Sequence, residues 1–411
     1  MTKGILKPFE VSEDQVGRLA PIELVQLVKR LIQADLHLAG VPLSAIQGSL
    51  KINVSDGGED IRVEWNSRSG TAEYNYLTIF QLKAENLSDS KLKKEPIEAN
   101  GQRLKASVAE VVAQGGNYII VTSKTNLITP KRGTKTKVPR LTEMRKLLHS
   151  SIKRFDARAD LSKLHIYGPT KIADWANRHP MIAIWMKQVL GIASADFAFQ
   201  TLEDWSQYRD LSNEHVSWPI LNDQMRAIQE LLIKPREVVR LLGHAGLGKS
   251  RLAFEALHSP ANDPASDLSP MVAYARTYSS NLISQVRDFI KNRCRVVLVI
   301  DECPPSGHRQ LSQEVHRDDS LLSMITLDLE FDKPSPEDRE MIVEAAPSEA
   351  IKEILRTSGT VLPPEDLERA TEFCSGFPLI AVLVAAGLNS GAEHFADSRP
   401  REYHEQVGLG A

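Results

Sequence analysis

The octapeptide Gly243–Ser250 constrains the fold of this chain more than any other segment. It reads Gly-His-Ala-Gly-Leu-Gly-Lys-Ser and lies between an apolar run, Val238–Leu242, and a helical pattern, Ser250–Leu257. Glycines let backbone N–H groups surround phosphate oxygens, and a helix N-terminus adds the positive end of its dipole. A strand, a glycine-rich loop and a helix in this order predict a phosphate-binding loop. The alternative is a purely structural glycine-rich turn that contains a lysine by chance.

The segments around this loop alternate between strand and helix patterns. Alternation of this kind is typical of βαβ units, so we expect a parallel sheet. The predicted strands are Val238–Leu242, Met271–Ala275, Arg295–Ile300 and Leu321–Leu327, and the predicted helices are Leu221–Leu232, Ser250–Leu257 and Leu282–Lys291.

Two acids end the third of these strands. Asp301 and Glu302 follow the run Val-Val-Leu-Val-Ile, at the carboxyl edge where open α/β sheets bind ligands. We expect Asp301 to hold Mg²⁺ and Glu302 to orient or deprotonate the attacking water, although a single acid at a strand end can also be a helix cap. The predicted nucleotide and Mg²⁺ residues are Gly243, Gly246, Gly248, Lys249, Ser250 and Asp301, with ATP and Mg²⁺ as cofactors and Ser250 and Asp301 as metal ligands.

The N-terminal part has a different order of elements. Apolar spacing predicts a helix over Pro21–Leu38, and period-two runs predict strands at Lys51–Val54, Ile61–Trp65 and Leu77–Ala84. A helix-like stretch from Ala106 to Ala113 then precedes a strand at Tyr118–Val121, and the tract from Leu141 to Leu190 is predicted to be helical.

Acids and one lysine gather on these strands. Gln81 and Lys83 share a strand face, and Asp60 on the neighbouring strand can lie beside them. Glu23, on the preceding helix, offers a further carboxylate. Hard oxygen ligands suit Mg²⁺, and a lysine neutralises charge on a phosphate, so the set describes a phosphodiesterase site; an ordinary polar strand face is the alternative.

Two family resemblances follow from these motifs. The loop, the Asp301-Glu302 strand end and the later Gly376-Phe377-Pro378-Leu379 resemble STAND NTPases, the signal-transduction relatives of the AAA+ class. Asp56-Gly57-Gly58 before Asp60, followed by Gln81-x-Lys83, resembles the Mrr-like PD-(D/E)xK nucleases. The second resemblance implies that Asp60 and Gln81 are metal ligands, Lys83 the catalytic lysine and Glu23 the helix-borne acid.

The chain also departs from the STAND pattern. Ile325–Leu329 offers no arginine after the fourth strand, and the repeat array with which such proteins recognise a trigger is missing after the Gly-Phe-Pro element. A fragment, a short form and a separate sensor protein are all compatible with this.

A basic segment, 124–154, holds ten Lys or Arg residues against one acid, Glu143, although the net charge of the chain is only −3. It contains few aromatic side chains, so it suits contact with DNA phosphates rather than base stacking; a solvated loop is the alternative. Its basic residues include Lys131, Arg132, Lys135, Lys137 and Arg140.

The length and composition of the chain predict how many domains it forms and in which compartment it folds. A chain of 411 residues with 42% hydrophobic residues predicts two or three soluble domains. Three separated cysteines, no secretory signal and no apolar run long enough to cross a bilayer predict a cytoplasmic protein. We expect an α/β chain with a restriction-endonuclease-like domain (1–200), a linker (201–217), a P-loop NTPase core of STAND or AAA+ type (218–335) and a short helical extension (336–411).

A chain that combines an N-terminal domain of the nuclease kind with an NTPase of the STAND kind is similar to antiviral STAND proteins of the Avs (AVAST) type. This resemblance implies an antiphage Mg²⁺-dependent endonuclease that cuts double-stranded DNA and is controlled by ATP and by homo-oligomerisation, with a phage protein or a separate sensor as trigger. Two alternatives stay open: an ATP-dependent regulatory protein whose nuclease fold only binds DNA, and a restriction-type nuclease driven along DNA by ATP.

Overall fold

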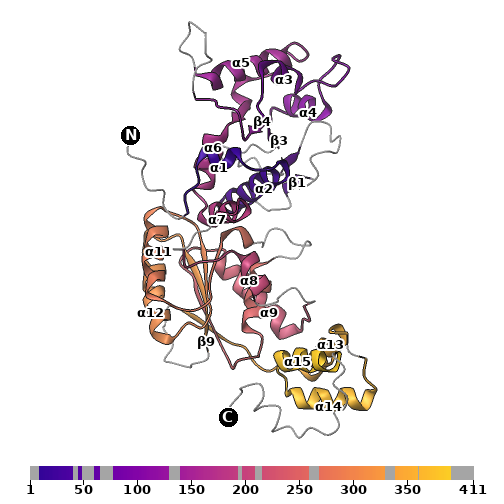
Figure 1. Ribbon diagram of the computed structural model, residues 1–411, viewed down its shortest axis with the longest axis vertical. Coiled ribbons are helices and arrows are strands. Elements are labelled where there is room, and N and C mark those ends of the chain that lie inside the picture. The colour runs from indigo at the N-terminus through magenta and orange to yellow at the C-terminus, as the bar shows by residue number, and fades with distance from the viewer. Residues whose placement is uncertain are drawn as a thin grey trace. The chain divides into compact units, whose positions relative to one another are not determined.

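The computed structural model describes residues 9–39, 45–48, 60–64, 77–128, 139–192, 197–208, 215–258, 268–328, 338–359 and 361–389. They divide into two compact units: an N-terminal unit of Met1–Phe197 with Ser259–Met271, and a C-terminal unit of Ala198–His258 with Val272–Ala411 (Figure 1). The predicted strand Lys51–Val54 and the Asp56-Gly57-Gly58 turn lie outside the described residues.

The N-terminal unit is built on a mixed five-stranded sheet of order β1-β2-β3-β4-β5. The strand β2 is antiparallel to both of its neighbours, β1 and β3, whereas β3, β4 and β5 are parallel. Its elements are α1 (Glu13–Gly17), α2 (Pro21–Leu38), β1 (Ile46–Gly48), β2 (Ile61–Glu64), β3 (Leu77–Lys83), α3 (Asp89–Lys94), α4 (Ala106–Gln114), β4 (Asn117–Thr122), α5 (Arg140–Lys153), a 3-10 turn (Leu161–Lys163), β5 (Leu164–Tyr167), α6 (Pro169–Ala176) and α7 (Pro180–Val189).

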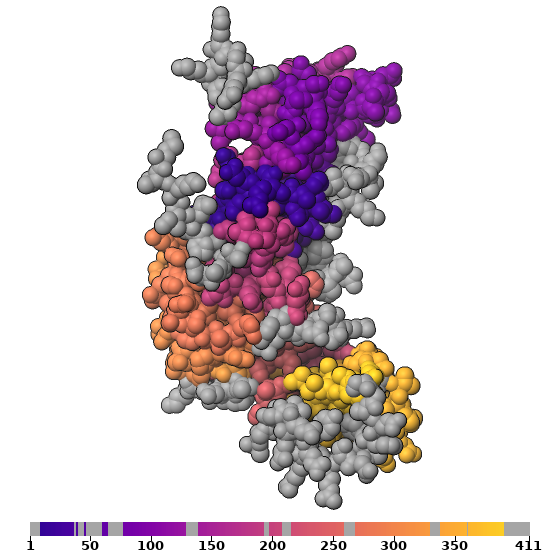
Figure 2. Space-filling view, in the orientation of Figure 1, coloured from indigo at the N-terminus to yellow at the C-terminus, as the bar shows by residue number. Residues whose placement is uncertain are grey.

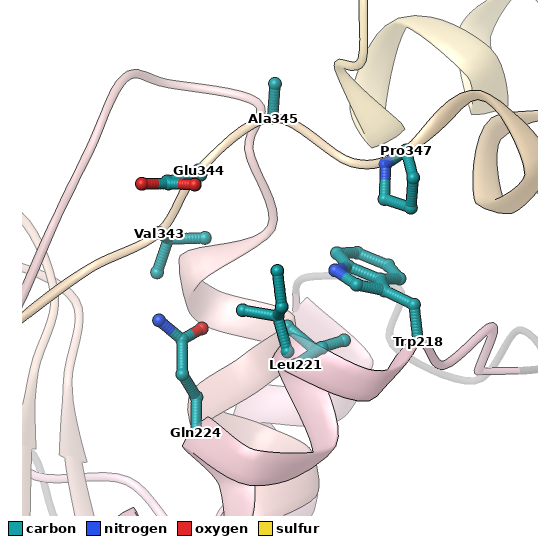
Figure 3. A pocket seen from close by; sticks show the side chains of 8 residues that line it. Trp218, Leu221, Gln224, Val343, Glu344, Ala345 and Pro347 are labelled. Carbon is teal, nitrogen blue, oxygen red and sulfur yellow. The ribbon is translucent and has the colours of Figure 1, made fainter.

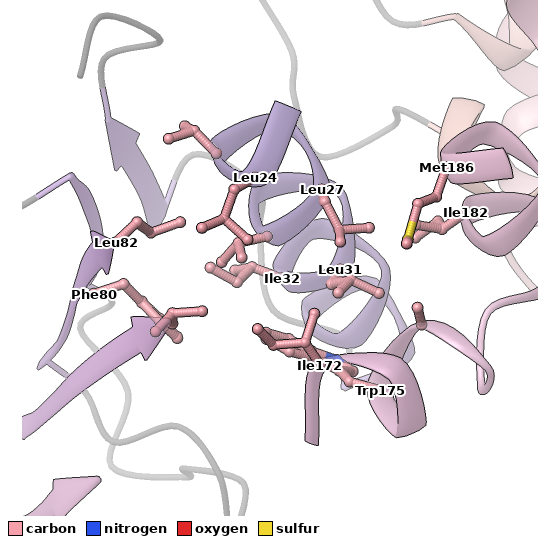
Figure 4. Packing of buried hydrophobic residues seen from close by; sticks show 14 of the residues in the cluster. Leu24, Leu27, Leu31, Ile32, Phe80, Leu82, Ile172, Trp175, Ile182 and Met186 are labelled. Atoms are coloured by element: carbon pink, nitrogen blue, oxygen red, sulfur yellow. The ribbon is translucent and has the colours of Figure 1, made fainter. Parts of the chain in front are cut away.

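Two hydrophobic cores cover the two faces of this sheet. On one face α2 packs between the sheet and the helices α6 and α7, with Leu24 and Ile32 near Phe80 and Leu82 (Figure 4). On the other face Ile79 and Ile120 pack against α3, α4 and α5. Because side chains alternate along a strand, Gln81 and Lys83 share the side of Ile79, opposite to α2.

The sequence-based expectation for this unit is confirmed for the helix Pro21–Leu38 and for the strands around Ile61, Leu77 and Tyr118. It is wrong for the tract Leu141–Leu190, which is interrupted by the strand β5. Leu164 and Ile166 are buried while His165 and Tyr167 are half-buried, so the four residues follow the strand period. Pairing with β4 decides the structure of this short segment.

The C-terminal unit contains a wholly parallel five-stranded sheet of order β10-β6-β9-β8-β7. The parallel α/β arrangement expected from the alternating pattern is confirmed. The elements are α8 (Leu202–Tyr208), α9 (Pro219–Leu232), β6 (Val238–Leu242), α10 (Lys249–Leu257), β7 (Val272–Ala275), α11 (Ser280–Lys291), β8 (Val297–Ile300), α12 (Pro305–Val315), β9 (Ser323–Asp328), β10 (Arg339–Ile342), α13 (Ser348–Thr357), α14 (Pro364–Cys374) and α15 (Pro378–Asn389); a 3-10 turn, Ser269–Met271, precedes β7.

Two segments of this unit differ from the expectation. The connector expected at 201–217 contains α8, whose Trp205 is fully buried and stacks on Tyr274 with ring centroids 4.5 Å apart. The extension expected to be helical from 336 includes the strand β10, which pairs with β6. The three helices that follow share a core of their own and are yellow-orange to yellow in Figure 2.

Within the described residues, no helix is both long and apolar enough to span a bilayer. Cys294, Cys303 and Cys374 are buried free thiols. Burial raises the pKa of Cys303 to about 12, with a further contribution from the charge of Asp328, so this thiol stays protonated and unreactive.

Candidate functional site

The glycine-rich loop connects β6 to α10. Gly243, Gly246 and Gly248 have φ angles of 148°, 84° and 93°, values that side chains with a Cβ rarely adopt. Gly248 is also the residue that precedes the first turn of α10. The loop therefore turns back over the helix N-terminus, where the orphan N–H groups of the first turn are available to an anion.

Lys249 folds back over this loop. Its Nζ atom donates hydrogen bonds to the carbonyl oxygens of Gly243, at 2.6 Å, and His244, at 2.9 Å. Burial lowers the pKa of Lys249, and the charges of Asp301 and Asp328 partly oppose this shift. The ammonium group is thus held inside the loop by neutral carbonyl oxygens and by two nearby carboxylates.

Three polar side chains meet at the end of β8. The Asp301 carboxylate, only 5% exposed, accepts a hydrogen bond from Tyr274 at 3.2 Å and lies 3.4 Å from the hydroxyl of Ser250. Glu302, with a φ of 45°, donates its N–H to Asp301 Oδ1 at 3.0 Å. A hydroxyl and a carboxylate beside the glycine-rich loop are the hard oxygen donors that Mg²⁺ prefers, so this set fits the cation.

The Gly376-Phe377-Pro378-Leu379 element contacts the loop. The N–H group of Leu379 donates to the carbonyl oxygen of Gly246 at 3.2 Å, and a Cβ on Gly246 would lie 3.3 Å from that of Leu379. Gly376, with a φ of 77°, accepts a hydrogen bond from Ala346 N–H at 2.8 Å. The start of α15 is therefore held against the glycine-rich loop by this hydrogen bond.

A small pocket of about 140 Å³ lies between α9 and the segment that follows β10 (Figure 3). Val343 borders both the pocket and the loop, because its N–H donates to Leu242 at 2.8 Å and its carbonyl oxygen would lie 2.7 Å from a Cβ on Gly243. The Trp218 ring faces Pro347. The lining residues are Trp218, Ile220, Leu221, Gln224, Val343, Glu344, Ala345 and Pro347.

Sequence reasoning missed a buried charge cluster next to these elements. Arg240, on β6, donates to Asp328 at 2.9 Å and to Glu340 at 3.2 Å. A lone arginine in an apolar strand gives no hint of its partners, which come from β9 and β10. Near them Asp338 accepts hydrogen bonds from Ser312 and pairs with His308 and His316, at 2.8 Å, 3.0 Å and 2.9 Å.

In the N-terminal unit the strand pairing places Asp60 opposite Gln81. Gln81 Nε2 and the N–H of Leu82 both donate to Asp60 Oδ2, each at 2.6 Å. Gln81 Oε1 is buried and has no hydrogen-bond partner. A buried amide oxygen beside a carboxylate fits a hard cation, because a cation would supply the interaction that this oxygen lacks.

Lys83 lies two residues further along the same face. Its Nζ atom is 2.9 Å from Glu95 Oε1, and Lys105 Nζ is 3.1 Å from the same oxygen. Neither Glu95 nor Lys105 belongs to a motif in the sequence. Their only sequence signal is that they flank α3 and α4, which cover this face of the sheet.

Glu23 is not brought together with these residues. It lies in the first turn of α2, and its Oε2 atom accepts a hydrogen bond from the N–H of Ala20 at 2.7 Å, as a helix-capping side chain does. The helix α2 covers the sheet face opposite to Gln81 and Lys83. Among the described residues, no group of three or more His, Cys, Asp or Glu side chains is placed to hold a metal.

Of the predicted DNA-binding segment 124–154, Lys131, Arg132, Lys135 and Lys137 lie outside the described residues. Arg140 is described, and it pairs with Asp89 and, at 3.6 Å, with Glu143. Its charge is therefore partly balanced within the N-terminal unit.

No protein-family model matches the sequence, and no curated protein matches it. Several solved structures resemble parts of the chain. A STAND protein with a tetratricopeptide repeat sensor from Pyrococcus horikoshii is 13% identical, with a TM-score of 0.33, over 47% of this chain and 32% of that protein. The HORMA:CdnC:Trip13 complex of E. coli MS115-1 contains a chain that is 11% identical, with a TM-score of 0.30, over 47% of this chain and 87% of its own.

A chain of the S. cerevisiae Hsp104:casein complex is 13% identical, with a TM-score of 0.31, over 48% of this chain and 42% of its own. Scores of this size describe loose similarity, so the assignment of the phosphate loop rests on the geometry of Gly243–Ser250 and its neighbours.

Proposed function

We propose that this chain is an ATP-binding switch of the P-loop class joined to a Mg²⁺-dependent endonuclease that acts on double-stranded DNA. The observation that carries the first half is the arrangement of Lys249, Ser250 and Asp301 around the loop between β6 and α10. The observation that supports the second half is the Asp60–Gln81 pair with its unpartnered amide oxygen.

At the nucleotide site each residue has a separate task. Lys249, which bonds two carbonyl oxygens, would bind β- and γ-phosphate oxygens in their place, and Ser250 and Asp301 would hold a Mg²⁺ ion that neutralises phosphate charge. Glu302 orients the attacking water and accepts a proton from it at its carboxylate. The pocket between Trp218 and Pro347 takes the nucleotide base against apolar side chains.

The start of α15 supplies a way to transmit the state of this site. Because Leu379 N–H is bonded to Gly246, a shift of the loop on nucleotide binding changes the position of α15. Two states that differ in this contact would be populated according to the nucleotide bound, and assembly into oligomers would follow from the favoured state.

At the second site Asp60 and Gln81 would hold a Mg²⁺ ion, which polarises the phosphodiester and lowers the pKa of a bound water. Lys83 neutralises the negative charge that develops on the phosphate. We propose double-stranded DNA as the substrate because segment 124–154, which follows β4 in the sequence, is strongly basic.

A specific observation favours one alternative, a nuclease fold that binds DNA without cutting it. Lys83 is paired with Glu95, and Glu23 caps its own helix rather than reaching the Asp60 face. In that case the N-terminal unit is a DNA-binding module whose engagement is governed by ATP.

A plasmid-cleavage assay separates the two functions. Purified protein is incubated with supercoiled plasmid and Mg²⁺, with and without ATP, and wild type is compared with Asp60→Asn, Lys83→Ala and Lys249→Ala. Lys93→Ala, which changes an exposed lysine of α3, is the matched control.

Cutting that is lost in Asp60→Asn and Lys83→Ala but kept in Lys93→Ala supports the nuclease. If cutting also requires ATP and Lys249, this supports coupling between the nucleotide site and the nuclease site. DNA binding without cutting, under every condition and in every variant, would contradict the nuclease and favour the idle fold.

A further inference from the structure

Two lysines of the N-terminal unit converge on one oxygen atom. Lys83 Nζ and Lys105 Nζ lie 2.9 Å and 3.1 Å from Glu95 Oε1. The three residues come from different elements: Lys83 ends β3, Glu95 follows α3, and Lys105 precedes α4. The fold, rather than local sequence, therefore aims two ammonium groups at a single point.

The cluster is partly shielded from water. The side chains of Lys83 and Lys105 are 24% and 25% exposed, and that of Glu95 is 12% exposed. Charges held in this way interact more strongly than freely solvated pairs, yet the lysines remain accessible to a ligand. With two cations and one anion, the cluster keeps a net positive charge.

Its position links it to the Asp60–Gln81 pair. Gln81 and Lys83 point to the same side of β3, and Asp60 pairs with Gln81 on that side. An oxyanion held by Lys83 and Lys105 would thus lie on the sheet face that carries the candidate metal ligands.

We propose that Lys83 and Lys105 form a binding site for a backbone phosphate of double-stranded DNA, and that Glu95 occupies this site when DNA is absent. A carboxylate oxygen accepts the same charge-assisted hydrogen bonds as a phosphate oxygen, so Glu95 stands in for the ligand. The inference deepens the proposed nuclease function and rests on it for the identity of the ligand.

This arrangement makes binding a competition. DNA gains the two lysines only after Glu95 leaves, so part of the binding free energy is used to open the ion pairs. Neutralising Glu95 removes the competitor, whereas removing Lys105 removes half of the site. The two substitutions therefore have opposite effects on DNA affinity.

The test measures binding of the full chain to a short fluorescein-labelled DNA duplex by anisotropy, in EDTA so that no cutting occurs. We expect Glu95→Gln to tighten binding by about three- to tenfold, the range that loss of a competing ion pair of about 1 kcal/mol gives. We expect Lys105→Ala to weaken binding by a similar factor and to reduce the slope of log affinity against log salt by about 1.

Two variants control for the change in net charge. Glu98→Gln neutralises a carboxylate that pairs with the exposed Arg103, three residues from Glu95. Lys93→Ala removes an exposed lysine of α3. Both should leave affinity within about twofold of wild type, because Glu98 pairs with Arg103 and Lys93 is exposed.

The double variant Glu95→Gln/Lys105→Ala decides between competition and a purely structural ion pair. Under the proposal, the gain from Glu95→Gln shrinks when Lys105 is absent. An unchanged or lower affinity in Glu95→Gln, or an equal gain in Glu98→Gln, would overturn it. If Glu95→Gln does not fold, as judged by its thermal unfolding, the salt slope of Lys105→Ala against that of Lys93→Ala decides alone.

Measuring both DNA binding and plasmid cutting distinguishes failure of the phosphate-site proposal from failure of the nuclease proposal. Tighter binding in Glu95→Gln, without cutting of plasmid in Mg²⁺ by any variant, supports the phosphate site and contradicts the nuclease. Cutting that needs Asp60, together with no effect of Glu95→Gln on binding, supports the nuclease and overturns the phosphate site.

Discussion

Leu379 donates its backbone N–H to the carbonyl oxygen of Gly246, at 3.2 Å, and so joins the first turn of α15 to the glycine-rich loop. The two residues are 133 positions apart in the chain. The N–H groups of a helix's first turn have no partner within the helix, so this one is free to bind the loop. A displacement of the loop at Gly246 would therefore act directly on α15, the last described helix of the C-terminal unit.

Substitution of Gly246 tests this contact. Gly246→Ala and Gly248→Ala both force a Cβ onto a backbone with positive φ, which costs about 1–2 kcal/mol, so both should weaken nucleotide binding. Only at Gly246 does the new Cβ meet Leu379, at 3.3 Å, whereas nothing lies within 4 Å of one on Gly248. Faster hydrogen exchange in α15 is therefore expected in Gly246→Ala alone; equal exchange in both variants would contradict the proposed link.

Lys249 is expected to dominate nucleotide affinity. In Lys249→Ala the phosphates lose a partly buried, charge-assisted contact of about 1.5–3 kcal/mol, so affinity should fall by about 10–100-fold. Fluorescent ATP binding measures this loss, with Lys291→Ala, an exposed lysine at the end of α11, as the control. Tight binding by Lys249→Ala would remove the phosphate-loop assignment.

The Gln81→Glu variant tests the candidate metal site through its effect on the free energy of unfolding. In the wild type, Gln81 donates a hydrogen bond to Asp60 at 2.6 Å. In the variant two carboxylates face each other and this bond is lost, so in EDTA the unfolding free energy should fall by about 1–3 kcal/mol. Mg²⁺ should restore most of this loss, because a cation between two carboxylates is favourable. Thermal unfolding with and without Mg²⁺ checks this, and Asp60→Asn/Gln81→Glu, which leaves one carboxylate, should respond less. A response to Mg²⁺ no larger than that of wild type would argue against a metal site.

Asp338 is expected to give the C-terminal unit a pH-dependent contribution to stability. Burial favours its neutral form, but hydrogen bonds from His308, His316 and Ser312 outweigh burial and lower the pKa of Asp338 to about 2. A carboxyl whose folded pKa is depressed stabilises the fold above its unfolded pKa, near 4, and loses this contribution as the pH falls towards 2.

Asp338→Asn should therefore lower the unfolding free energy by about 2 kcal/mol at pH 7 and by much less near pH 2–3. Urea unfolding at the two pH values measures the difference, with Asp319→Asn, an exposed carboxylate paired with Arg317, as the control. A gap that stays constant with pH would mean that the charge of Asp338 does not stabilise the fold.

The sequence alone determined the elements whose signal is local. The glycine-rich loop is encoded in eight consecutive residues, and its flanking strand and helix follow from apolar spacing within a dozen residues. The same holds for the helix Pro21–Leu38, for the strand that carries Gln81, and for the strands that begin just after Asp60 and end just before Asp301. These features depend on backbone sterics and on side-chain periodicity, which neighbouring residues fix.

The tertiary structure decided everything that depends on contacts between distant segments. The strand Leu164–Tyr167 exists because β4 offers a partner, and the charge of Arg240 is balanced by carboxylates from two other strands. Glu95 meets Lys83 and Lys105 only after β3, α3 and α4 have packed. Pairwise contacts over long separations leave no periodic trace in the sequence, because each partner alone is an ordinary polar residue and only chain folding brings the two together.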